Sequence, residues 1–197
     1  MKKFLSVIIL CLFFFCSYGQ KNVIVIKKEN YTSYFDTVLR QPVVVVYDLF
    51  IGGGPCSRAG FNFKNDLPNV KTATSLDYAK SGYDRGHLAN AEDFAYDCKL
   101  DELTFRYYNC LPQSKILNRG VWKQKEEEAR EMSMRDSVKI VCFGRDFFLD
   151  KRLNVPRFCG KIVKEKNGKI HFWYFDQNGT LLPADEKILK EYISYLK

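Results

Sequence analysis

The hydrophobic and polar positions along this chain predict a domain built from both strands and helices. Residues 42–51 (PVVVVYDLFI) are rich in β-branched side chains and predict a buried strand, which the following sequence GGGP ends. Residues 138–144 (VKIVCFG) predict a further strand. Two more strands are predicted at 158–164 and 169–175, because Asn167-Gly168 between them favours a tight hairpin turn.

Two other segments have helical patterns. Residues 120–134 contain strong helix formers, with neither proline nor an internal glycine. Residues 184–196 place their apolar side chains at helical spacing. We expect residues 20–40 to lead into the domain and residues 56–82 to form a long irregular segment, and such segments often carry function. The predicted fold class is therefore α+β, with a mainly antiparallel central sheet flanked by helices.

The first 19 residues predict a signal peptide, which is not part of the fold. Lys2 and Lys3 precede an apolar run from Phe4 to Phe15, and small residues at 17–19 offer a cleavage site before Gln20. The run is about 12 residues long, whereas a membrane-spanning helix needs roughly 20, so a cleaved signal is favoured over a membrane anchor. We expect a secreted or periplasmic protein with a single domain over residues 20–197.

Charge and cysteine content narrow the function only slightly. The net charge is +8, of which Lys2 and Lys3 account for two, so the mature domain carries +6. A basic exported domain suits an anionic partner such as nucleic acid, although the same charge also serves solubility. Five cysteines remain after signal removal and allow up to two disulfides in an oxidising compartment. They are Cys56, Cys98, Cys110, Cys142 and Cys159, and the sequence does not give their pairing.

The two histidines lie in different surroundings. His171 lies in an alternating run typical of a strand, so we interpret it as a sheet residue. His87 ends the sequence Asp-Arg-Gly-His at 84–87, beside an acid, a cation and a glycine. A neutral imidazole suits the task of a general base near pH 7, and a guanidinium such as that of Arg85 suits a phosphate. Taken alone, this tetrapeptide is equally compatible with a structural turn.

A second polar segment follows at residues 105–122. Asn118 stands just before the predicted helix, where it could cap the helix or offer its amide oxygen to Mg²⁺. Trp122, Glu126 and Arg130 follow at intervals of four and share one helix face. They could be a core tryptophan beside a surface ion pair, or a site in which Glu126 acts through water and Arg130 meets phosphate. Eight helical residues span about 12 Å, so we expect Asn118 to precede the first regular turn.

Together these motifs resemble the DNA/RNA non-specific endonuclease family, the ββα-metal nucleases with a DRGH motif that include the endonuclease G type. The first motif is intact at residues 84–87. The second signature is an Asn-x-x-Pro-Gln sequence, then Asn-x-Gly-x-Trp, then Glu and Arg. Here it is formed by Asn109, Pro112, Gln113, Asn118, Gly120, Trp122, Glu126 and Arg130. The similarity extends weakly over residues 42–176.

The resemblance implies a role for each matched residue. His87 would be the general base, and Arg85, Arg58 and Glu126 would complete the catalytic set. Asn118 would be the sole direct protein ligand of one Mg²⁺ or Mn²⁺, with Glu126 reaching it through water. Asn109 and Arg130 would form the substrate-binding set, Asn109 by bracing the site with hydrogen bonds and Arg130 by lying near the phosphate.

The expected activity is hydrolysis of phosphodiester bonds in DNA and RNA, without sequence preference, to leave 5′-phosphate ends. Two alternatives stay open. A degenerate member of the family would bind nucleic acid without cutting it. A metal phosphodiesterase would act on small esters, but such enzymes usually use two metals with several Asp and His ligands, and this chain has only two histidines. The sequence gives neither the preference between DNA and RNA nor the oligomeric state.

Overall fold

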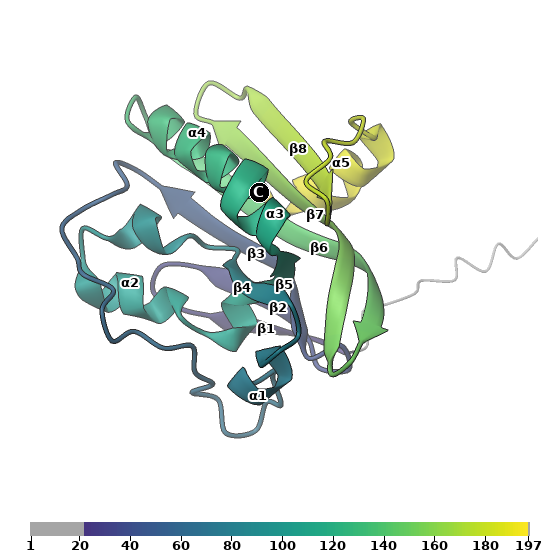
Figure 1. Cartoon of the computed structure of the whole chain (residues 1–197). Coiled ribbons are helices and arrows are strands. Elements are labelled where there is room, and N and C mark those ends of the chain that lie inside the picture. Colours follow the sequence, from purple (N-terminus) through teal and green to yellow (C-terminus); the bar gives the residue numbers. More distant parts are fainter. Residues whose placement is uncertain (1–21, 197) are drawn as a thin grey trace, which may run out of the picture.

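The computed structural model describes residues 22–196 and shows an α+β domain, as the sequence predicts. The predicted signal peptide lies outside the described residues. The central sheet has six strands in the order β1-β2-β3-β6-β7-β8, and each neighbouring pair is antiparallel. The strands are β1 (Val23–Lys27), β2 (Thr32–Asp36), β3 (Gln41–Leu49), β6 (Val138–Asp150), β7 (Leu153–Glu165) and β8 (Ile170–Asp176). Figure 1 shows helices on both faces of this sheet.

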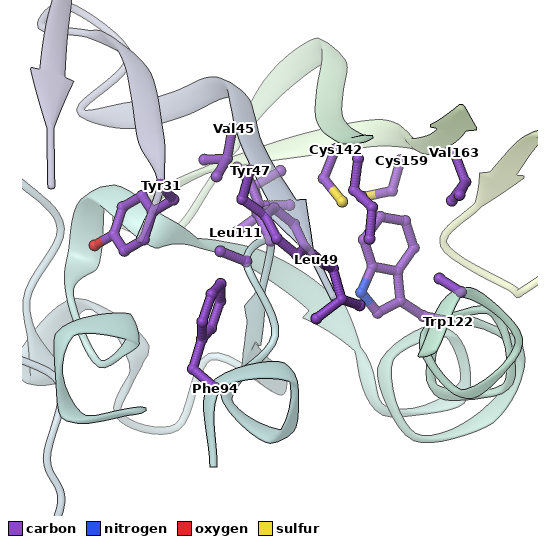
Figure 2. Packing of buried hydrophobic residues seen from close by; sticks show 14 of the residues in the cluster. Tyr31, Val45, Tyr47, Leu49, Phe94, Leu111, Trp122, Cys142, Cys159 and Val163 are labelled. Atoms are coloured by element: carbon purple, nitrogen blue, oxygen red, sulfur yellow. The ribbon is translucent and has the colours of Figure 1, made fainter. Parts of the chain in front are cut away.

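The alternation of side chains along the strands separates two cores. In β3 and β6, Val45 and Ile140 face a large cluster that includes Trp122, whereas Val44 and Phe143 face a second cluster on the opposite side. The first cluster lies under α4 (Lys123–Ser133), and Figure 2 shows Trp122 between that helix and the sheet. The second lies under α5 (Glu186–Ile193) and a closing 3₁₀ turn, Ser194–Leu196. The helix and turn together match the helix expected at 184–196.

A separate two-stranded sheet lies on the α4 side of the domain. It pairs β4 (Tyr83–His87) with β5 (Cys110–Ser114) in antiparallel register. The short helices α1 (Ser75–Tyr78) and α2 (Cys98–Thr104) surround it, and β5 continues directly into α3 (Lys115–Leu117). A π-helical turn, Asn118–Trp122, then joins α3 to α4. The ββα unit is therefore β4, β5 and the α3–α4 helical segment.

Several element boundaries differ from the expectations. Residues 20–40 hold two strands, β1 and β2, which were not expected. Strand β6 continues to Asp150, beyond the expected end at Gly144. The hairpin between β7 and β8 is confirmed, with Gly168 at φ +90, a conformation that favours glycine. None of the helices in the described part of the chain is long and apolar enough to cross a membrane.

Candidate active site

His87 ends strand β4, and the neighbouring strand β5 fixes its position. His87 pairs with Cys110 across the two strands, and Gly86, which is buried, pairs with Leu111. A Cβ added at position 86 would overlap the side chain of Gln113. Glycine at 86 therefore lets β4 pack closely on β5, and this packing places the next side chain, His87, at the edge of a cleft.

The imidazole of His87 lies between two aromatic rings. The ring centroids of Phe63 and Phe105 are each 4.8 Å from its own, and both phenylalanines come from outside the ββα unit. The side chain as a whole is half-buried, and its Nε2 atom is itself buried and has no hydrogen-bond partner in the structure. Burial, together with the positive charges of Arg58 and Arg85, lowers the pKa of His87 to about 3. The ring is therefore neutral at pH 7 and able to accept a proton.

Asn118 is oriented by Asp84. Its Nδ2 donates to Oδ2 of Asp84 at 3.2 Å, and Arg119 donates to both oxygens of the same carboxylate at 2.7 and 2.9 Å. The hydrogen bonds from Arg119 are the main reason that the pKa of Asp84 is lowered, so Asp84 stays ionised. With its nitrogen directed to Asp84, the amide of Asn118 leaves its oxygen available as an acceptor or metal ligand.

Two sequence interpretations of Asn118 were wrong. The residue that caps the helical segment is Ser114, whose side chain accepts from the Leu117 N–H, so Asn118 is not an N-cap. Asn118 also does not precede the first regular turn, because α3 comes before it. The offset from α4 arises at Gly120, which has non-helical angles (φ −101, ψ −113) inside the π-helical turn. This kink brings Asn118 and the face of α4 that carries Glu126 to the same cleft.

Glu126 and Arg130 are held by buried charges behind the cleft. Burial raises the pKa of Glu126, which is 7% exposed, and the opposite charge of Lys161 reduces that rise. Arg130 forms an ion pair with Asp93, which is fully buried and also accepts from the hydroxyl of Tyr47 at 2.8 Å. Arg130 therefore pairs with Asp93, and the surface ion pair with Glu126 considered from the spacing is wrong.

Lys161 is buried behind the cleft, where its charge acts on Glu126 and Asp93, although it was not identified from the sequence. It is fully buried on β7, with its Nζ 3.3 Å from Sγ of Cys142 and 4.6 Å from the centroid of the Trp122 ring. The sequence does contain a pattern that indicates this burial. Lys161 lies two residues from Cys159 and two from Val163, and side chains at this spacing in a strand point to the same face, which here is the core under α4. That period places the lysine inside the domain.

The two remaining arginines line the cleft from different segments of the chain. Arg58 lies in the long segment after β3 and forms an ion pair with Glu92. Arg85 stacks its guanidinium over the rings of Phe63 and Tyr78, at 5.4 and 5.8 Å from their centroids. No ion pair to Arg85 occurs among residues 22–196, which leaves its charge available for an anionic ligand.

The cleft has a volume of about 510 Å³ and brings most of the expected residues together. Its lining includes Arg58, Arg85, His87, Asn118, Glu126 and Arg130, which are six of the seven residues singled out in the sequence. The rest of the lining is Asn90, Glu92, Arg119, Lys123 and Glu127. Five cationic side chains and three carboxylates therefore line the cleft, a balance that favours an anionic ligand.

Asn109 is the exception, because it does not line the cleft but braces the chain behind it by hydrogen bonds, which is how its place in the substrate-binding set was expected to arise. The side chain is fully buried, accepts from the Ala89 N–H at 2.9 Å, and donates to the carbonyls of Ala89 and Thr104 at the same distance. All of these contacts are internal, so Asn109 cannot touch a ligand in the cleft. It joins the segment after His87 to the start of β5.

The oxygen atoms of this cleft fit a hard divalent cation. An asparagine amide oxygen and a carboxylate are ligands that Mg²⁺ accepts, and Mg²⁺ usually keeps several waters. No cluster of three or more His, Cys, Asp or Glu residues suited to a metal occurs within residues 22–196. An ion bound here would therefore depend on Asn118, with water molecules linking it to Glu126.

The comparisons with known proteins agree with this geometry. The profile of the DNA/RNA non-specific endonuclease family matches residues 15–194, and the chain belongs to this family. It is 31% identical over 132 residues to the mitochondrial endonuclease G of Bos taurus, an alignment that covers 64% of this chain and 44% of that protein. A nuclease of Nostoc sp. is 33% identical over 110 residues, covering 52% of this chain and 40% of the relative. The chain thus spans less than half the length of these relatives.

A solved structure shares the fold. A chain in the crystal structure of the EndoG/EndoGI complex superimposes with a TM-score of 0.69 at 22% identity, over 84% of this chain and 82% of the other. At this identity the likeness establishes the fold alone, and it confirms the α+β, ββα-metal nuclease architecture expected from the sequence.

Proposed function

We propose that this protein is an exported endonuclease that hydrolyses phosphodiester bonds of DNA and RNA with His87 as general base and one divalent cation, Mg²⁺ or Mn²⁺, at Asn118. The observation that carries the proposal is the convergence of His87, Asn118 and three arginines on one cleft of the ββα unit. A phosphodiester needs a base for water and positive charge around the phosphate, and this cleft offers both.

His87 is suited to accept the proton of the attacking water. Its side chain lines the cleft, and its pKa of about 3 keeps the ring neutral before substrate binds. A base with so low a pKa is weak; burial is the largest cause of the low value, and the charges of Arg58 and Arg85 are the other two. A bound phosphate offsets these charges, so the pKa of His87 rises once substrate is present. The base would then be strengthened in the complex that reacts.

The other cleft residues position and stabilise the phosphate. Arg58, Arg85 and Arg130 place guanidinium groups that fork onto phosphate oxygens. When bound at Asn118, the cation would supply charge stabilisation for the leaving oxygen. Water attacks phosphorus, the bond to the 3′ oxygen breaks, and that oxygen takes up a proton. The products are then a 5′-phosphate and a 3′-hydroxyl. Contacts to phosphate and sugar do not read base edges, so many sequences would be cut.

Export is also part of the proposal. It is supported by the signal-like sequence of the first 19 residues and by the disulfide between Cys56 and Cys98. Disulfides persist mainly in oxidising compartments such as the periplasm or the extracellular space. The other three cysteines of the mature sequence are buried free thiols.

The test is incubation of the purified protein with plasmid DNA and with RNA, in Mg²⁺ and in EDTA. We expect cleavage of both substrates in Mg²⁺ and none in EDTA. His87→Ala should lower the cleavage rate by roughly 10²- to 10⁴-fold and still bind an oligonucleotide. His171→Ala is the matched control, because His171 lies on β8 and contacts Glu165, which is not among the cleft residues. Cleavage by His87→Ala at the rate of His171→Ala would refute the assignment.

Two other outcomes identify the alternatives. Binding without cleavage by the unmodified protein in Mg²⁺ would indicate a degenerate binding module. Hydrolysis of a small chromogenic phosphodiester, with no cleavage of plasmid or RNA, would indicate a phosphodiesterase acting on small esters.

A further inference from the structure

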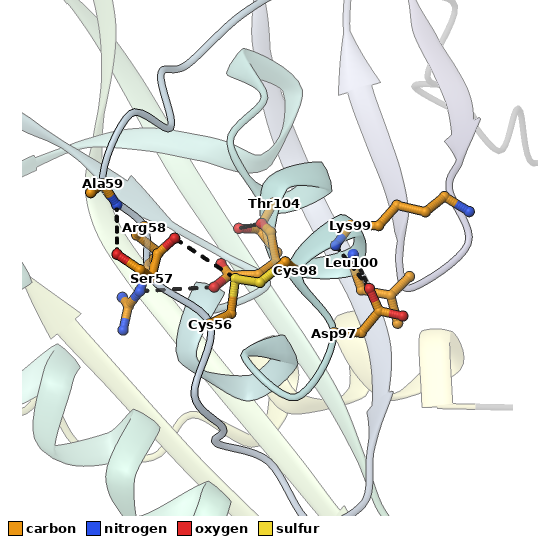
Figure 3. Close-up of a disulfide and its surroundings, with 10 residues drawn as sticks. Cys56, Ser57, Arg58, Ala59, Asp97, Cys98, Lys99, Leu100 and Thr104 are labelled. Carbon is orange, nitrogen blue, oxygen red and sulfur yellow. Dashed lines mark hydrogen bonds and ion pairs between the residues drawn. A yellow bond between two sulfur atoms is a disulfide. The ribbon is translucent and has the colours of Figure 1, made fainter.

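The disulfide joins the segment that carries Arg58 to the helix that carries Asp101, a residue that contacts Arg58. Cys56 lies in the irregular segment after β3, two residues before Arg58, and Cys98 is the first residue of α2. The two cysteines are 42 residues apart in the sequence. Figure 3 shows Arg58 beside the disulfide, on the same stretch of chain as Cys56.

The stretch around Arg58 has few other means of holding its shape. Residues 57–60 are all exposed. The backbone N–H of Cys56 donates to the Ala95 carbonyl at 3.0 Å, and the next backbone bond to another part of the fold is Lys64 to Phe105, at 3.2 Å. Between these two points the only backbone bond recorded in the described chain is internal, from Phe61 to Arg58. A segment of this kind opens at a low free-energy cost unless a cross-link holds it.

Helix α2 offers a second contact on the same face. Asp101 lies three residues after Cys98, so both side chains share one side of the helix. Its carboxylate is fully buried, and neither oxygen has a hydrogen-bond partner. The nearest cation is Arg58, whose Nε lies 3.9 Å from Oδ2 of Asp101. The other end of the same guanidinium pairs with Glu92.

We propose that the Cys56–Cys98 disulfide and Asp101 are positioning groups that hold Arg58 in the catalytic cleft, and that cleavage therefore depends on the oxidised disulfide. This inference rests on the proposed nuclease function. The disulfide fixes the backbone two residues before Arg58, and Asp101 fixes the guanidinium. Neither group is among the residues that line the cleft.

The bond is accessible to reductants because Cys98 is exposed on the surface. An external dithiol such as dithiothreitol supplies two electrons and two protons. The Cys56–Cys98 bond breaks to give two thiols, and the dithiol becomes a cyclic disulfide. The segment that carries Arg58 is then released from α2.

The experiment compares oxidised and dithiothreitol-treated protein in a plasmid cleavage assay with Mg²⁺. We expect reduction to lower kcat/KM by roughly 10- to 100-fold, the scale expected when a catalytic group is misplaced. The variant Cys56→Ser/Cys98→Ser should have the low activity from the start and not respond to dithiothreitol, which also controls for any effect of the thiol on the metal. Wild-type activity in this variant, or full activity of the reduced protein, would overturn the proposal.

Arg58→Ala separates positioning from general stability. If the disulfide acts through Arg58, reduction should change the already low activity of Arg58→Ala by less than about twofold, because coupled residues are non-additive. A loss as large as that of the wild type would show that the disulfide acts elsewhere and would contradict the proposal.

Asp101→Asn keeps the disulfide and the shape of the side chain, and it should lower kcat/KM while leaving the thermal midpoint near that of the wild type. Unchanged kcat/KM in Asp101→Asn would refute the role of Asp101.

A binding measurement distinguishes failure of the positioning proposal from failure of the proposed nuclease function. In EDTA, affinity for a fluorescent oligonucleotide should fall with salt, and the slope should decrease by about one when a single phosphate contact is lost. We expect that decrease on reduction of the wild type and in Arg58→Ala. An equal slope in oxidised and reduced protein would overturn the positioning role even if no cleavage is observed. Absence of cleavage by the oxidised protein in Mg²⁺ would instead refute the nuclease function.

Discussion

The buried lysine behind the cleft allows a quantitative test of the site. Two carboxylates, Glu126 and Asp93, face two cations, Lys161 and Arg130. Lys161 and Asp93 are 0% exposed, Glu126 is 7% exposed, and the side chain of Arg130 is 18% exposed. Burial lowers the pKa of Lys161, but the neighbouring Cys142, Glu126 and Asp93 outweigh this effect and raise it above its usual value. Lys161 is therefore charged and balances a buried carboxylate.

Lys161→Met removes this charge and keeps a flexible apolar side chain of similar length. Lys161 acts on the two carboxylates through its charge, and removing a buried compensating charge costs about 3–5 kcal/mol when the remaining charge stays uncompensated. We expect the free energy of unfolding to fall by this amount in urea denaturation at pH 7.5, followed by far-UV circular dichroism. The deficit should be smaller at pH 5.5, because without Lys161 the pKa of Glu126 rises further and the carboxyl group can take up a proton.

A double-mutant cycle checks that the lost pairing is the cause. Glu126→Gln removes the negative charge, so the double variant Lys161→Met/Glu126→Gln should recover about 1–3 kcal/mol relative to additive losses. A loss of less than about 1 kcal/mol in the free energy of unfolding of Lys161→Met would refute the role of its charge. Additive losses from the two substitutions would refute it as well.

Three further outcomes follow from the site. Asp84→Ala should raise the Mg²⁺ concentration for half-maximal cleavage by about 10- to 100-fold, because Asp84 orients the amide of Asn118; an unchanged requirement would exclude this role. Gly86→Ala should destabilise the fold by about 1–3 kcal/mol in urea, since its Cβ would overlap Gln113, and a neutral effect would contradict the close packing of β4 on β5. The third outcome concerns acid. The folded pKa of His87, about 3, lies below the unfolded value of about 6.5, so the unfolded chain binds the proton first and stability is lost as pH falls from 6.5 towards 3. His87→Gln should lose less stability than the wild type between pH 7 and pH 4, measured as the midpoint of urea denaturation. The same pH dependence in both proteins would show that His87 does not cause the loss.

The residues that line the cleft could be predicted because they stand in short motifs. Gly86 beside His87, and Asn118 before a helix with Glu126 and Arg130, mark the cleft at fixed spacings in the sequence. The hairpin at Asn167-Gly168 was also predictable, because that dipeptide favours one turn geometry. In both cases a local sequence fixes a local geometry.

The rest depends on contacts between distant segments. Asp93 and Arg130 are 37 residues apart in the sequence, and no local pattern predicts that they form an ion pair. The hydrogen-bond partners of Asn109 lie at Ala89 and Thr104, 20 and 5 residues away, so no local pattern gives its full burial. Strand β1 is a short, partly exposed edge strand, and β2 is short with a serine, Ser33, at one of its buried positions, so the apolar alternation of both was too weak to recognise.

The central claim is that His87 and Asn118 act on one phosphate from the same cleft. The most direct measurement is a crystal structure of His87→Ala with Mn²⁺ and an uncleaved DNA oligonucleotide, with the ion located by anomalous scattering. We predict an anomalous peak at about 2.2 Å from Oδ1 of Asn118, on the scale of hard-cation–oxygen distances, and one phosphate between that ion and position 87. A manganese ion bound away from Asn118, or DNA lying outside the cleft, would contradict it.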